Sequence, residues 1–559
     1  MVNNKKMAVI AMMAASSMLL AACTENSNDQ ASELESTQVI LSEQGVYPLV
    51  QEKVTLKVMV GARDFVENYE TNQFTKWYEE LTNVHIDWEV VPSKSIPEKL
   101  NLMLASGDYP DVVLNMAVSN EQQMVYGKDG VFLPLNGLIE KHAPNVQQRL
   151  AELAGMKEVL TAPNGSIYAL PQIEQCYHCT LSQKLWIYKP WLDKLKLDMP
   201  TTTEAYYEVL KAFKEQDPNG NGLQDEIPLA GSPKGWNTRV NDVLMNAFIP
   251  NNTLTSTKHM FLNGGKVEVA FDKPEWKQGL EYLHRMHKEG LLATESFTQD
   301  GMQLQQMGEQ VGAHLLGSAP GGATGAMSKM FGASGKWMEF APVPPLKGPR
   351  GVQLAAYNPY GGSMFGKFLI TKNAKYPEVA MRWVDGFYGK WDDPTEIMMR
   401  SLYGVPGRDW VKAEEGMIGI HGQAAKYKVL VPSETTNQNV HWSQTAPTVR
   451  SSDFRLSEAI DLATADQNPE VRLYKATKLY EPHQMKVNTI LPPLFLTREQ
   501  SEELAGLQKT ILEYVDQMVA RFVTGDADLN TEWTPYLDTL KGMKLKRYVE
   551  IYQEAYDKR

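Results

Sequence analysis

The sequence predicts an α/β protein of two lobes, each a mostly parallel sheet flanked by helices, with an extra helical part at the C-terminus. Strand and helix patterns alternate over residues 54–115, as they do in an open parallel sheet. Two long helical patterns, residues 496–523 and 533–557, close the chain. A chain of 559 residues is too long for a single core, which favours two lobes.

The first lobe is predicted from patterns that follow one another closely. Residues 54–60 alternate apolar and polar side chains like a strand, and they are followed by helix 68–81, strand 85–91, helix 96–105 and strand 111–115. Ligands bind beyond the carboxyl ends of the strands in such sheets. We therefore expect the loops after the first and third strands, which contain Arg63 and Asn115, to face a ligand cleft.

The remaining patterns are spread over the rest of the chain. They predict helix 203–216, strand 227–231, helix 274–289, strand 310–316, a returning segment 338–343, strand 368–371 and helix 378–388. The long pattern that begins near residue 496 opens with Thr497, Arg498 and Glu499, which is typical of a capped helix start.

Residues 1–23 have the features of an export signal. Lys5 and Lys6 precede an apolar stretch that is too short to span a membrane. Leu-Ala-Ala-Cys, ending at Cys23, resembles a lipobox, the signal for cleavage and lipid attachment. The alternative is an ordinary signal peptide with a chance cysteine. Residues 24–45 are polar and predict a flexible tether behind a lipid anchor.

Charge and hydropathy narrow the range of partners. The formal net charge of −12 argues against nucleic acid and against anionic surfaces as partners. No stretch after the signal approaches the roughly 20 apolar residues of a membrane-spanning helix. We therefore expect a globular body that is held at the membrane only by its lipid.

Residues 217–226 are rich in oxygen side chains and predict a calcium site. The oxygens alternate along the chain, and Gly222 stands at the sixth position, where a calcium loop turns sharply. The candidate ligands are Asp217, Asn219, Asn221, the backbone carbonyl of Leu223, Asp225 and Glu226. The twelfth position is Pro228 rather than glutamate. A polar surface turn is the alternative, and the flanking helix and strand patterns favour a structural role for the ion.

The segment Cys176-Tyr177-His178-Cys179 holds the two cysteines that follow Cys23. A local disulfide is the interpretation favoured outside the cell, with free thiols next. A zinc site would need further ligands. A thioredoxin-like redox pair would normally open a helix after a strand in a much smaller fold.

Several motifs together resemble one known family. They are Leu-Ala-Ser-Gly-Asp-Tyr-Pro-Asp at residues 104–111, Ile-Tyr-Ala-Leu-Pro at 167–171, Tyr-Lys-Pro-Trp-Leu-Asp-Lys-Leu at 188–195, the loop at 217–228 and Tyr-Pro-Glu-Val-Ala at 376–380. These motifs resemble those of extracellular solute-binding proteins of carbohydrate ABC importers, family 1. The long, lipoprotein-type subfamily that includes LplA and the alginate-binding proteins is the most similar.

The resemblance implies the type II, two-lobed fold of periplasmic binding proteins, with a sugar held between the lobes. The expected divisions are signal 1–23, tether 24–45, lobe I from 46–172 and 337–425, and lobe II from 173–336 and 426–559. The implied function is a lipid-anchored, monomeric receptor on the outer face of a Gram-positive cell membrane. It would deliver an oligosaccharide to ABC permease subunits.

Sugars bind to flat aromatic rings and to well-placed polar groups in concave sites. Four irregular stretches offer such groups, at residues 234–239, 357–362, 403–410 and 439–442. With the loops and the cysteine segment above, they give the candidate ligand-binding residues Arg63, Asn115, Tyr177, Trp236, Asn237, Arg239, Tyr360, Arg408, Trp410 and Trp442. Core packing is the alternative for each aromatic side chain.

Two other classes of function stay open at this point. An extracellular polysaccharide-degrading enzyme would need paired carboxylates in a cleft, and 67 acidic residues always offer some pairing. The sequence contains neither Gly-x-Ser-x-Gly nor His-Glu-x-x-His, so we expect no catalytic residues. A sensory surface lipoprotein that binds no sugar is the third class.

Overall fold

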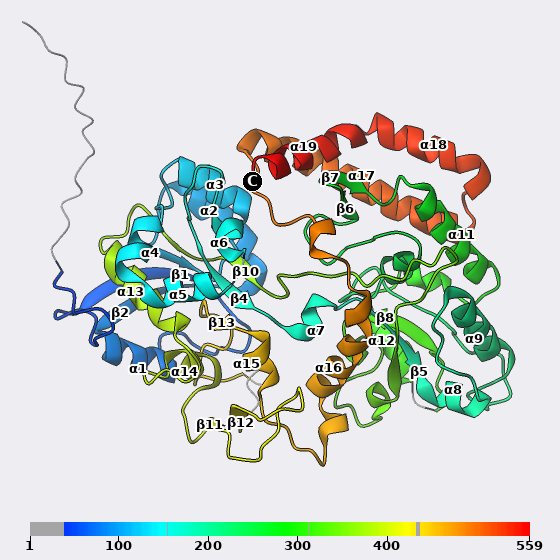
Figure 1. The fold of residues 1–559 in the computed structure, drawn as a ribbon, viewed down its shortest axis with the longest axis horizontal. Helices are drawn as coiled ribbons and strands as arrows, with labels where there is room; N and C mark the ends of the chain where they lie inside the picture. Colours follow the sequence, from blue (N-terminus) through cyan, green and yellow to red (C-terminus); the bar gives the residue numbers. More distant parts are fainter. Residues whose placement is uncertain (1–38, 154, 311, 432–436) are drawn as a thin grey trace, which may run out of the picture. The chain divides into compact units, whose positions relative to one another are not determined.

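The structure is a computed structural model that describes residues 39–153, 155–310, 312–431 and 437–559 (Figure 1). The predicted export signal, Cys23 and the tether up to residue 38 lie outside the described residues. Residues 39–559 form one compact unit. In this described part of the chain, no helix combines the length and the apolar character that crossing a membrane requires.

Lobe I is built, within the described residues, on a six-stranded mixed sheet in the order β13-β4-β10-β3-β1-β2. Its strands are β1 (Val54–Gly61), β2 (Val84–Val91), β3 (Val112–Leu114), β4 (Leu170–Glu174), β10 (Met364–Ile370) and β13 (Val449–Arg450). β1 pairs in parallel with β2 and β3, which confirms the predicted opening of the sheet. β13 is parallel to β4, whereas β10 is antiparallel to β3 and β4.

Helices flank this sheet. α1 (Gln73–Thr82) begins later than the predicted residue 68, because the side chain of Asn72 accepts a hydrogen bond from the Phe74 N–H and caps the helix there. The predicted helices 96–105 and 378–388 correspond to α2 (Ile96–Ser106) and α13 (Pro377–Asp385). The other helices of this lobe are α3 (Asn120–Lys128), α4 (Asn136–His142), α5 (Pro144–Glu152), α6 (Met156–Leu160) and α14 (Ile397–Tyr403).

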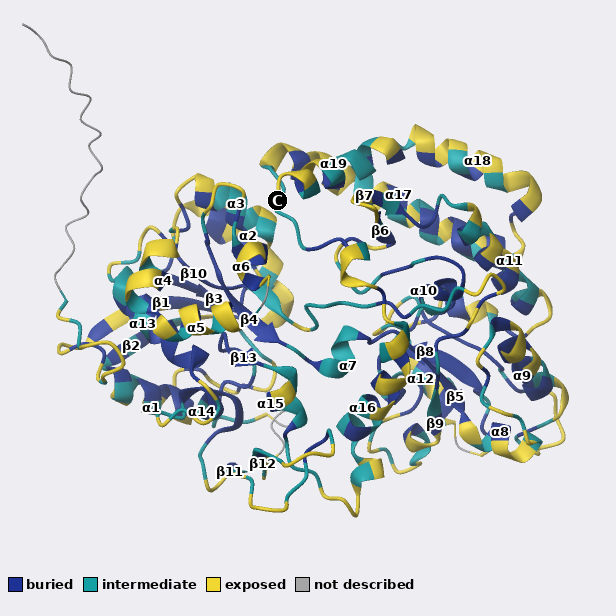
Figure 2. Cartoon of the chain, in the orientation of Figure 1, coloured by how far each residue is buried: buried dark blue, intermediate teal, exposed yellow. Residues whose placement is uncertain are grey.

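The strands of the lobe I sheet are largely buried (Figure 2), and apolar side chains cover both faces of the sheet. Val58 and Val60 of β1 belong to one cluster, and Met59 between them belongs to the other. This alternation follows from the two-residue period of a strand. The sheet is therefore buried on both faces, and polar side chains such as Asn115 and Glu174 lie at the ends of its strands.

Lobe II contains an antiparallel sheet in the order β8-β5-β9, which corrects the expectation of a mostly parallel sheet. Its strands are β5 (Lys184–Tyr188), β8 (Ser318–Gly321) and β9 (Phe340–Val343). The predicted strands 227–231 and 310–316 are reduced to single parallel bridges, such as Ile227 with Leu316. Pro228 has no N–H to donate, and Gly312 has a φ of 99°, so regular pairing is interrupted.

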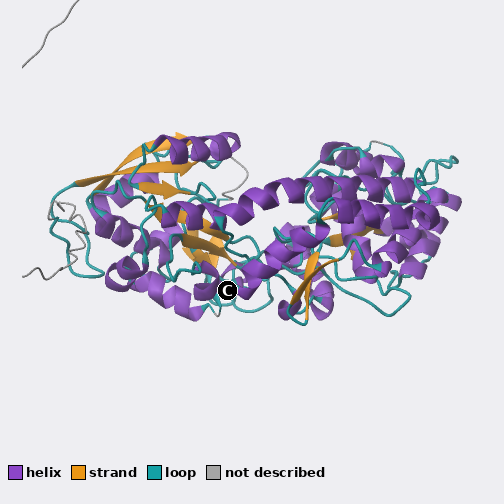
Figure 3. Ribbon diagram, turned by 90° about the horizontal axis from the view of Figure 1, so that it is seen from above, coloured by secondary structure: helices purple, strands orange, loops and turns teal. Residues whose placement is uncertain are grey.

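Helices make up most of the rest of lobe II (Figure 3), together with the hairpin of β6 and β7. These elements are α8 (Lys189–Leu195), α9 (Thr203–Glu215), α10 (Val240–Leu244), β6 (Met260–Asn263), β7 (Lys266–Val269), α11 (Pro274–Lys288), α12 (Gly301–Glu309), α16 (Pro469–Tyr480), α17 (Arg498–Thr524), α18 (Leu529–Gly542) and α19 (Leu545–Asp557). The capped start at Thr497 is confirmed. The predicted helix 533–557 is divided, because Lys544 adopts a left-handed φ of 63° between α18 and α19.

Three segments of the described chain cross between the lobes. They are residues 175–183 with α7 (Tyr177–Thr180), residues 344–363, and residues 451–468 with α15 (Ser452–Leu456). The apolar cluster of lobe II includes Phe340 and Leu346, and that of lobe I includes Trp442 and Val449. The second and third crossings therefore come later in the chain than the expected divisions at 337 and 426.

Two short strands form a small unit near the third crossing. β11 (Trp410–Lys412) pairs antiparallel with β12 (Tyr427–Val429). Trp410 and Tyr427 pack there with Phe454 in a cluster of their own. This unit explains why a stretch that reads as a glycine-rich loop is folded.

Candidate ligand site at the crossing segments

The crossing segments contact one another beside the carboxyl end of β4. The N–H of Asn358 donates to the carbonyl of Thr180 at 2.8 Å, and the hydroxyl of Ser452 donates to the carbonyl of Gln175 at 2.7 Å. All three crossings thus meet at one place. Loops positioned by rigid sheets in this way are common sites of binding.

Glu174, the last residue of β4, is the centre of a buried ionic network. Its carboxylate accepts from Arg450 at 2.5 Å and from Arg455 at 2.7 Å. Burial raises the pKa of Glu174, but the two guanidinium charges outweigh that effect and lower it. Arg455 also lies 3.8 Å from Glu470 of α16. The network therefore ties the lobe I sheet to a helix of lobe II.

A second buried network holds the end of β3. The Nζ of Lys367 donates to Asn115 Oδ1 at 2.5 Å, Gln172 Oε1 at 2.7 Å and the Gln444 carbonyl at 2.7 Å. Burial lowers the pKa of Lys367, yet three acceptors match the three donors of an ammonium. Asn115 also donates to the Gly61 carbonyl at 2.6 Å. The candidate Asn115 is thus a buried, fully engaged side chain.

Trp236 has the geometry of a sugar-stacking ring. Half of the residue is exposed (50%). A Cβ placed on Gly322 would lie 2.2 Å from the indole, so the ring lies directly against that glycine. Its neighbour Asn237 donates to the hydroxyl of Ser182, in the first crossing segment, at 2.9 Å. The Trp236 ring therefore packs against Gly322, is partly open to solvent and lies beside the first crossing segment.

Tyr177 and Tyr360 lie in the crossing segments themselves. Tyr177 packs against Tyr474 with 5.4 Å between ring centroids, and the Nζ of Lys478 lies 5.1 Å from its ring centre. Burial raises the pKa of Tyr177 to about 12. Tyr360 packs edge-on against Phe365 at 5.5 Å. Both tyrosines are partly exposed, which leaves ring surface for a ligand. The hydroxyl oxygen of Tyr177 is itself buried and has no hydrogen-bond partner among the described residues.

Two of the three candidate arginines are paired with carboxylates, whereas the Nε of Arg63 is buried without a hydrogen-bond partner among the described residues. Arg239 pairs with Asp516 at 2.7 Å, and Arg408 pairs with Asp409 at 2.7 Å. The backbone N–H of Arg63 donates to a tyrosine hydroxyl at 3.1 Å. The pairing of Arg239 and Arg408 with carboxylates neutralises the charge that they would offer to a ligand.

Trp410 and Trp442 are packing residues. Each is 1% exposed. The indole N–H of Trp410 donates to the Gly404 carbonyl at 3.1 Å, and that of Trp442 donates to the Thr75 hydroxyl at 2.7 Å. Their glycine- and asparagine-rich surroundings predicted open loops, but Trp410 packs in the small cluster with Tyr427 and Phe454, and Trp442 packs in the main apolar cluster of lobe I. We therefore leave both out of the site that we propose below.

The oxygen-rich loop at residues 217–226 follows α9 and is tightly hydrogen-bonded. Asp217 accepts from the N–H of Gly220 at 2.8 Å and of Gly222 at 2.9 Å. The side-chain amides of Asn219 and Asn221 donate to Asp225 at 2.9 Å. The residue Leu223 is 61% exposed, so only its carbonyl could serve an ion.

The surroundings of the Glu226 carboxylate indicate whether this loop can bind a cation. Its Oε2 is buried without a hydrogen-bond partner among the described residues. Burial first, and then the charges of Asp217 and Asp225, raise the pKa of Glu226. A buried, partnerless carboxylate oxygen beside two further carboxylates fits a hard cation. The Oδ1 atoms of Asn219 and Asn221 accept from the N–H groups of Asn221 at 3.0 Å and Leu223 at 2.7 Å.

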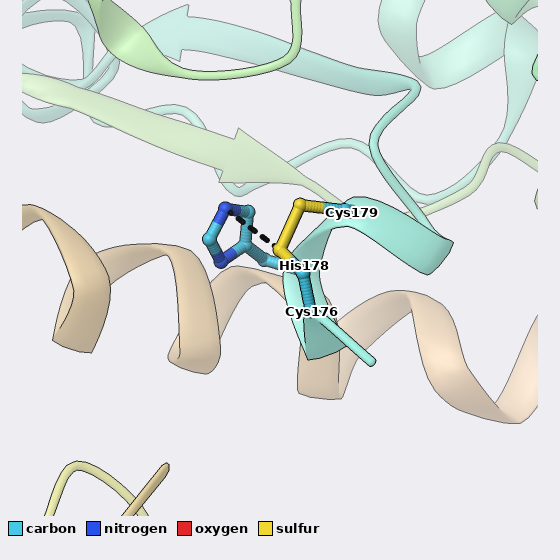
Figure 4. Close-up of side chains that lie close together, drawn as sticks. All are labelled: Cys176, His178 and Cys179. Atoms are coloured by element: carbon cyan, nitrogen blue, oxygen red, sulfur yellow. Dashed lines mark hydrogen bonds between the residues drawn. A yellow bond between two sulfur atoms is a disulfide. The ribbon is translucent and has the colours of Figure 1, made fainter. Parts of the chain in front are cut away.

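Cys176 and Cys179 are joined by a disulfide in the first crossing segment (Figure 4). Their Cα atoms are 5.1 Å apart. His178 lies between them in sequence, and its Nε2 is 3.4 Å from the Cys176 sulfur. The bridge closes a single turn, α7, at the point where the chain leaves the lobe I sheet.

Sequence reasoning missed Glu174, Lys367, Arg450 and Arg455. Lys367 could have been noticed, because it interrupts the apolar strand Phe-Gly-Lys-Phe-Leu-Ile, and lysine is seldom fully buried without a partner. The other three carry no local signal. Their partners are far apart in sequence and meet only because β4 and β13 are adjacent.

The fold, with two lobes and several crossings, defines a solute-binding protein. The chain belongs to the bacterial extracellular solute-binding protein family, whose model matches residues 54–390.

Particular relatives match this chain beyond the residues of the family model. The chain is 28% identical over 534 residues, 92% of each chain, to the fructooligosaccharide ABC transporter substrate-binding protein FusA of Streptococcus pneumoniae. It is 26% identical to the polygalacturonan/rhamnogalacturonan-binding protein YtcQ of Bacillus subtilis, over 61% of this chain and 64% of YtcQ. The structure of FusA with kestose matches with a TM-score of 0.70 at 26% identity, covering 90% of this chain and 99% of that one.

Proposed function

We propose that this chain captures an oligosaccharide at the crossing segments and delivers it to the membrane subunits of an ABC importer. Family membership and the similarity to FusA and YtcQ, which are named as carbohydrate-binding proteins, support this function. The observation that carries the proposal is Trp236, half exposed and backed by Gly322 beside the first crossing. Its indole would stack on the C–H face of a sugar ring.

The polar partners would come from the crossing segments. Asn237, Tyr177 and Tyr360 are partly exposed near Trp236 or in the crossings themselves, and we propose Arg63, Arg239 and Arg408 as more distant contacts. We propose that Asn115 supports the site indirectly, because its hydrogen bonds to Lys367 and Gly61 hold the end of β3 in place. Ligand binds the closed arrangement of the lobes better than the open one and shifts the population toward it.

The chain itself performs no chemistry in this proposal. The closed form is recognised by the permease, and other subunits of the importer use ATP. An extracellular enzyme is the alternative, and it predicts that the sugar is cleaved. Incubation with oligosaccharides followed by chromatography separates the two, since a receptor leaves the sugar intact and raises its own melting temperature.

We propose that the loop at residues 217–226 binds a structural Ca²⁺. Asp217, Asn219, Asn221, Asp225 and Glu226 would supply side-chain oxygens, and Leu223 would supply its carbonyl. Two similar structures are an EF-hand mutant of FusA in complex with fructo-nystose and the alginate-binding protein AlgQ2 without calcium ion, which supports an ion site in those proteins. AlgQ2 is 22% identical to this chain, so its likeness bears on the fold alone.

We also propose that Cys23 carries lipid and anchors a monomer to the outer face of a Gram-positive cell membrane. The lipobox-like sequence before Cys23 supports this, together with the extracellular family. The polar tether would let the lobes reach the permease while they stay close to the membrane.

A further inference from the structure

The cysteine segment offers a ligand set that sugar binding does not use. In the described chain, Cys176, His178 and Cys179 are grouped so that one ligand atom of each lies within 4.8 Å of the others (Figure 4). His178 and Cys179 are partly exposed, whereas Cys176 is buried. Solvent therefore has access to the group from one side.

Glu470 completes the arrangement from the other lobe. The Nε2 of His178 faces the Cys176 sulfur at 3.4 Å, and its Nδ1 lies 3.3 Å from Glu470 Oε2. A histidine that binds a metal through one nitrogen usually donates its other N–H to a carboxylate, which fixes the ring. Here that carboxylate is in place before any metal is present.

We propose that the reduced form of this segment binds Zn²⁺ through Cys176, Cys179 and His178, with Glu470 as a positioning residue. Two thiolates and an imidazole form a donor set that zinc prefers, at the two-residue cysteine spacing of zinc knuckles. Three protein ligands leave the fourth tetrahedral position to water. The disulfide and the zinc complex are alternative closures of the same turn.

The interconversion balances with an external dithiol as the reductant. The dithiol is oxidised to its disulfide while the Cys176–Cys179 bond is broken and both sulfurs become thiols. Zn²⁺ then binds both sulfurs as thiolates and releases two protons. The 5.1 Å between the Cα atoms already suits ligands on one helical turn.

Closure of α7 by a disulfide or by zinc should stabilise the first crossing segment. α7 packs against α16 through Tyr177 and Tyr474. The disulfide and the zinc complex each close α7, whereas the reduced, metal-free segment loses that closure and keeps only its backbone hydrogen bonds and its side-chain contacts with α16. We expect the reduced, metal-free protein to melt at a lower temperature, and we expect Zn²⁺ to restore the oxidised value in full or in part.

Cobalt reports the site directly, because thiolate ligation of Co²⁺ produces charge-transfer absorption. The protein is reduced with a phosphine, which binds metal weakly, and titrated with Co²⁺ and then with Zn²⁺ in competition. We expect one equivalent of thiolate-bound Co²⁺ that Zn²⁺ displaces. The oxidised wild type is the control for binding at the oxygen-rich loop, and it should show no charge-transfer band.

Variants assign the ligands. Cys179→Ser and His178→Gln should each lower Co²⁺ affinity at least tenfold, and Glu470→Gln should lower it by about 10–100-fold. Glu481→Gln is the matched control, because Glu481 pairs with Lys478 and not with the histidine. The melting temperature of each oxidised or metal-free variant shows whether it is folded. Reduced protein without a charge-transfer band, or a full band in folded Cys179→Ser, would overturn the proposal.

Discussion

The indole of Trp236 lies against Gly322 so closely that a Cβ at residue 322 would come within 2.2 Å of ring carbons. The N–H of Gly322 also donates to the Trp236 carbonyl at 2.8 Å. The glycine therefore fixes the position of the ring although it need not touch a ligand. Gly322→Ala should displace the indole and weaken sugar binding nearly as much as Trp236→Ala does.

We expect each of these two changes to weaken binding by about 1–3 kcal/mol, the scale of losing one well-packed aromatic contact. Calorimetric titration measures it. Gly506→Ala is the matched control, because a Cβ there meets no atom within 4 Å. Normal binding by both Gly322→Ala and Trp236→Ala would place the sugar elsewhere in the protein.

Removal of calcium should destabilise the protein. Without the ion, Asp217, Asp225 and Glu226 repel one another in one loop, and the buried Glu226 oxygen keeps no partner. A chelator should lower the melting temperature, and Ca²⁺ should restore it by mass action. Mg²⁺ should restore it less, because it demands octahedral geometry and gives up water reluctantly.

Two variants distinguish side-chain ligands from the carbonyl ligand. Asp217→Ala should lower the melting temperature and abolish the response to Ca²⁺. Leu223→Ala should keep the response, since its side chain is 61% exposed and only its carbonyl is expected to bind. A melting curve that the chelator leaves unchanged, with no metal by elemental analysis, would leave the loop as a polar turn.

Asp385 should make stability fall as the pH rises. Burial raises its pKa in the folded protein from 3.8 to about 7, against the hydrogen bonds from Val146 and Asn145 that lower it. Between these values the folded state binds more protons than the unfolded state, so stability is lost as pH rises through this window. The loss is up to roughly 4 kcal/mol above pH 7.

Asp385→Asn should remove this dependence, because the amide stays neutral and can still accept from Val146. The variant should gain stability relative to wild type between pH 5 and pH 8, measured by denaturant unfolding at each pH. Asp198→Asn, at an exposed position, is the control. A constant difference between Asp385→Asn and wild type across this range would show that Asp385 is ionised throughout.

Loss of the anchor should release the protein. Cys23→Ser removes the thiol that would accept lipid, so the variant should appear in the medium or remain unprocessed in cells. Fractionation with an antibody measures this. A variant as strongly membrane-bound as the wild type would show that Cys23 is not the anchor.

The fold of lobe I followed from local patterns because its early strands carry regular apolar positions. β1 and β3 are largely buried, and apolar residues alternate with polar ones along the first part of β2. The antiparallel order of the lobe II sheet could not be predicted in this way. The relative direction of paired strands depends on the long connections between them, which have no local sequence pattern. The pairing of β5 with β8 and β9 joins residues more than a hundred positions apart. The break at Lys544 was hidden too, since lysine is otherwise a good helix former.

The part of the site that could be predicted is the cysteine pair, because two nearby cysteines in an exported protein usually form a disulfide. Cys176 and Cys179 are joined as the favoured interpretation expects. Trp236 is exposed, whereas Trp410 and Trp442 are buried, although all three occur in similar glycine- and asparagine-rich stretches. Composition cannot separate them, because burial there is decided by which distant side chains cover the loop.

The central claim is that the crossing segments hold an oligosaccharide without changing it. Titration calorimetry of the purified protein against fructooligosaccharides and oligogalacturonides, with chromatography of the sugar afterwards, tests it most directly. We predict one bound oligosaccharide per chain, weakened in Trp236→Ala and recovered intact. Binding to none of these sugars by folded, calcium-loaded protein, or recovery of shortened sugar, would contradict the account.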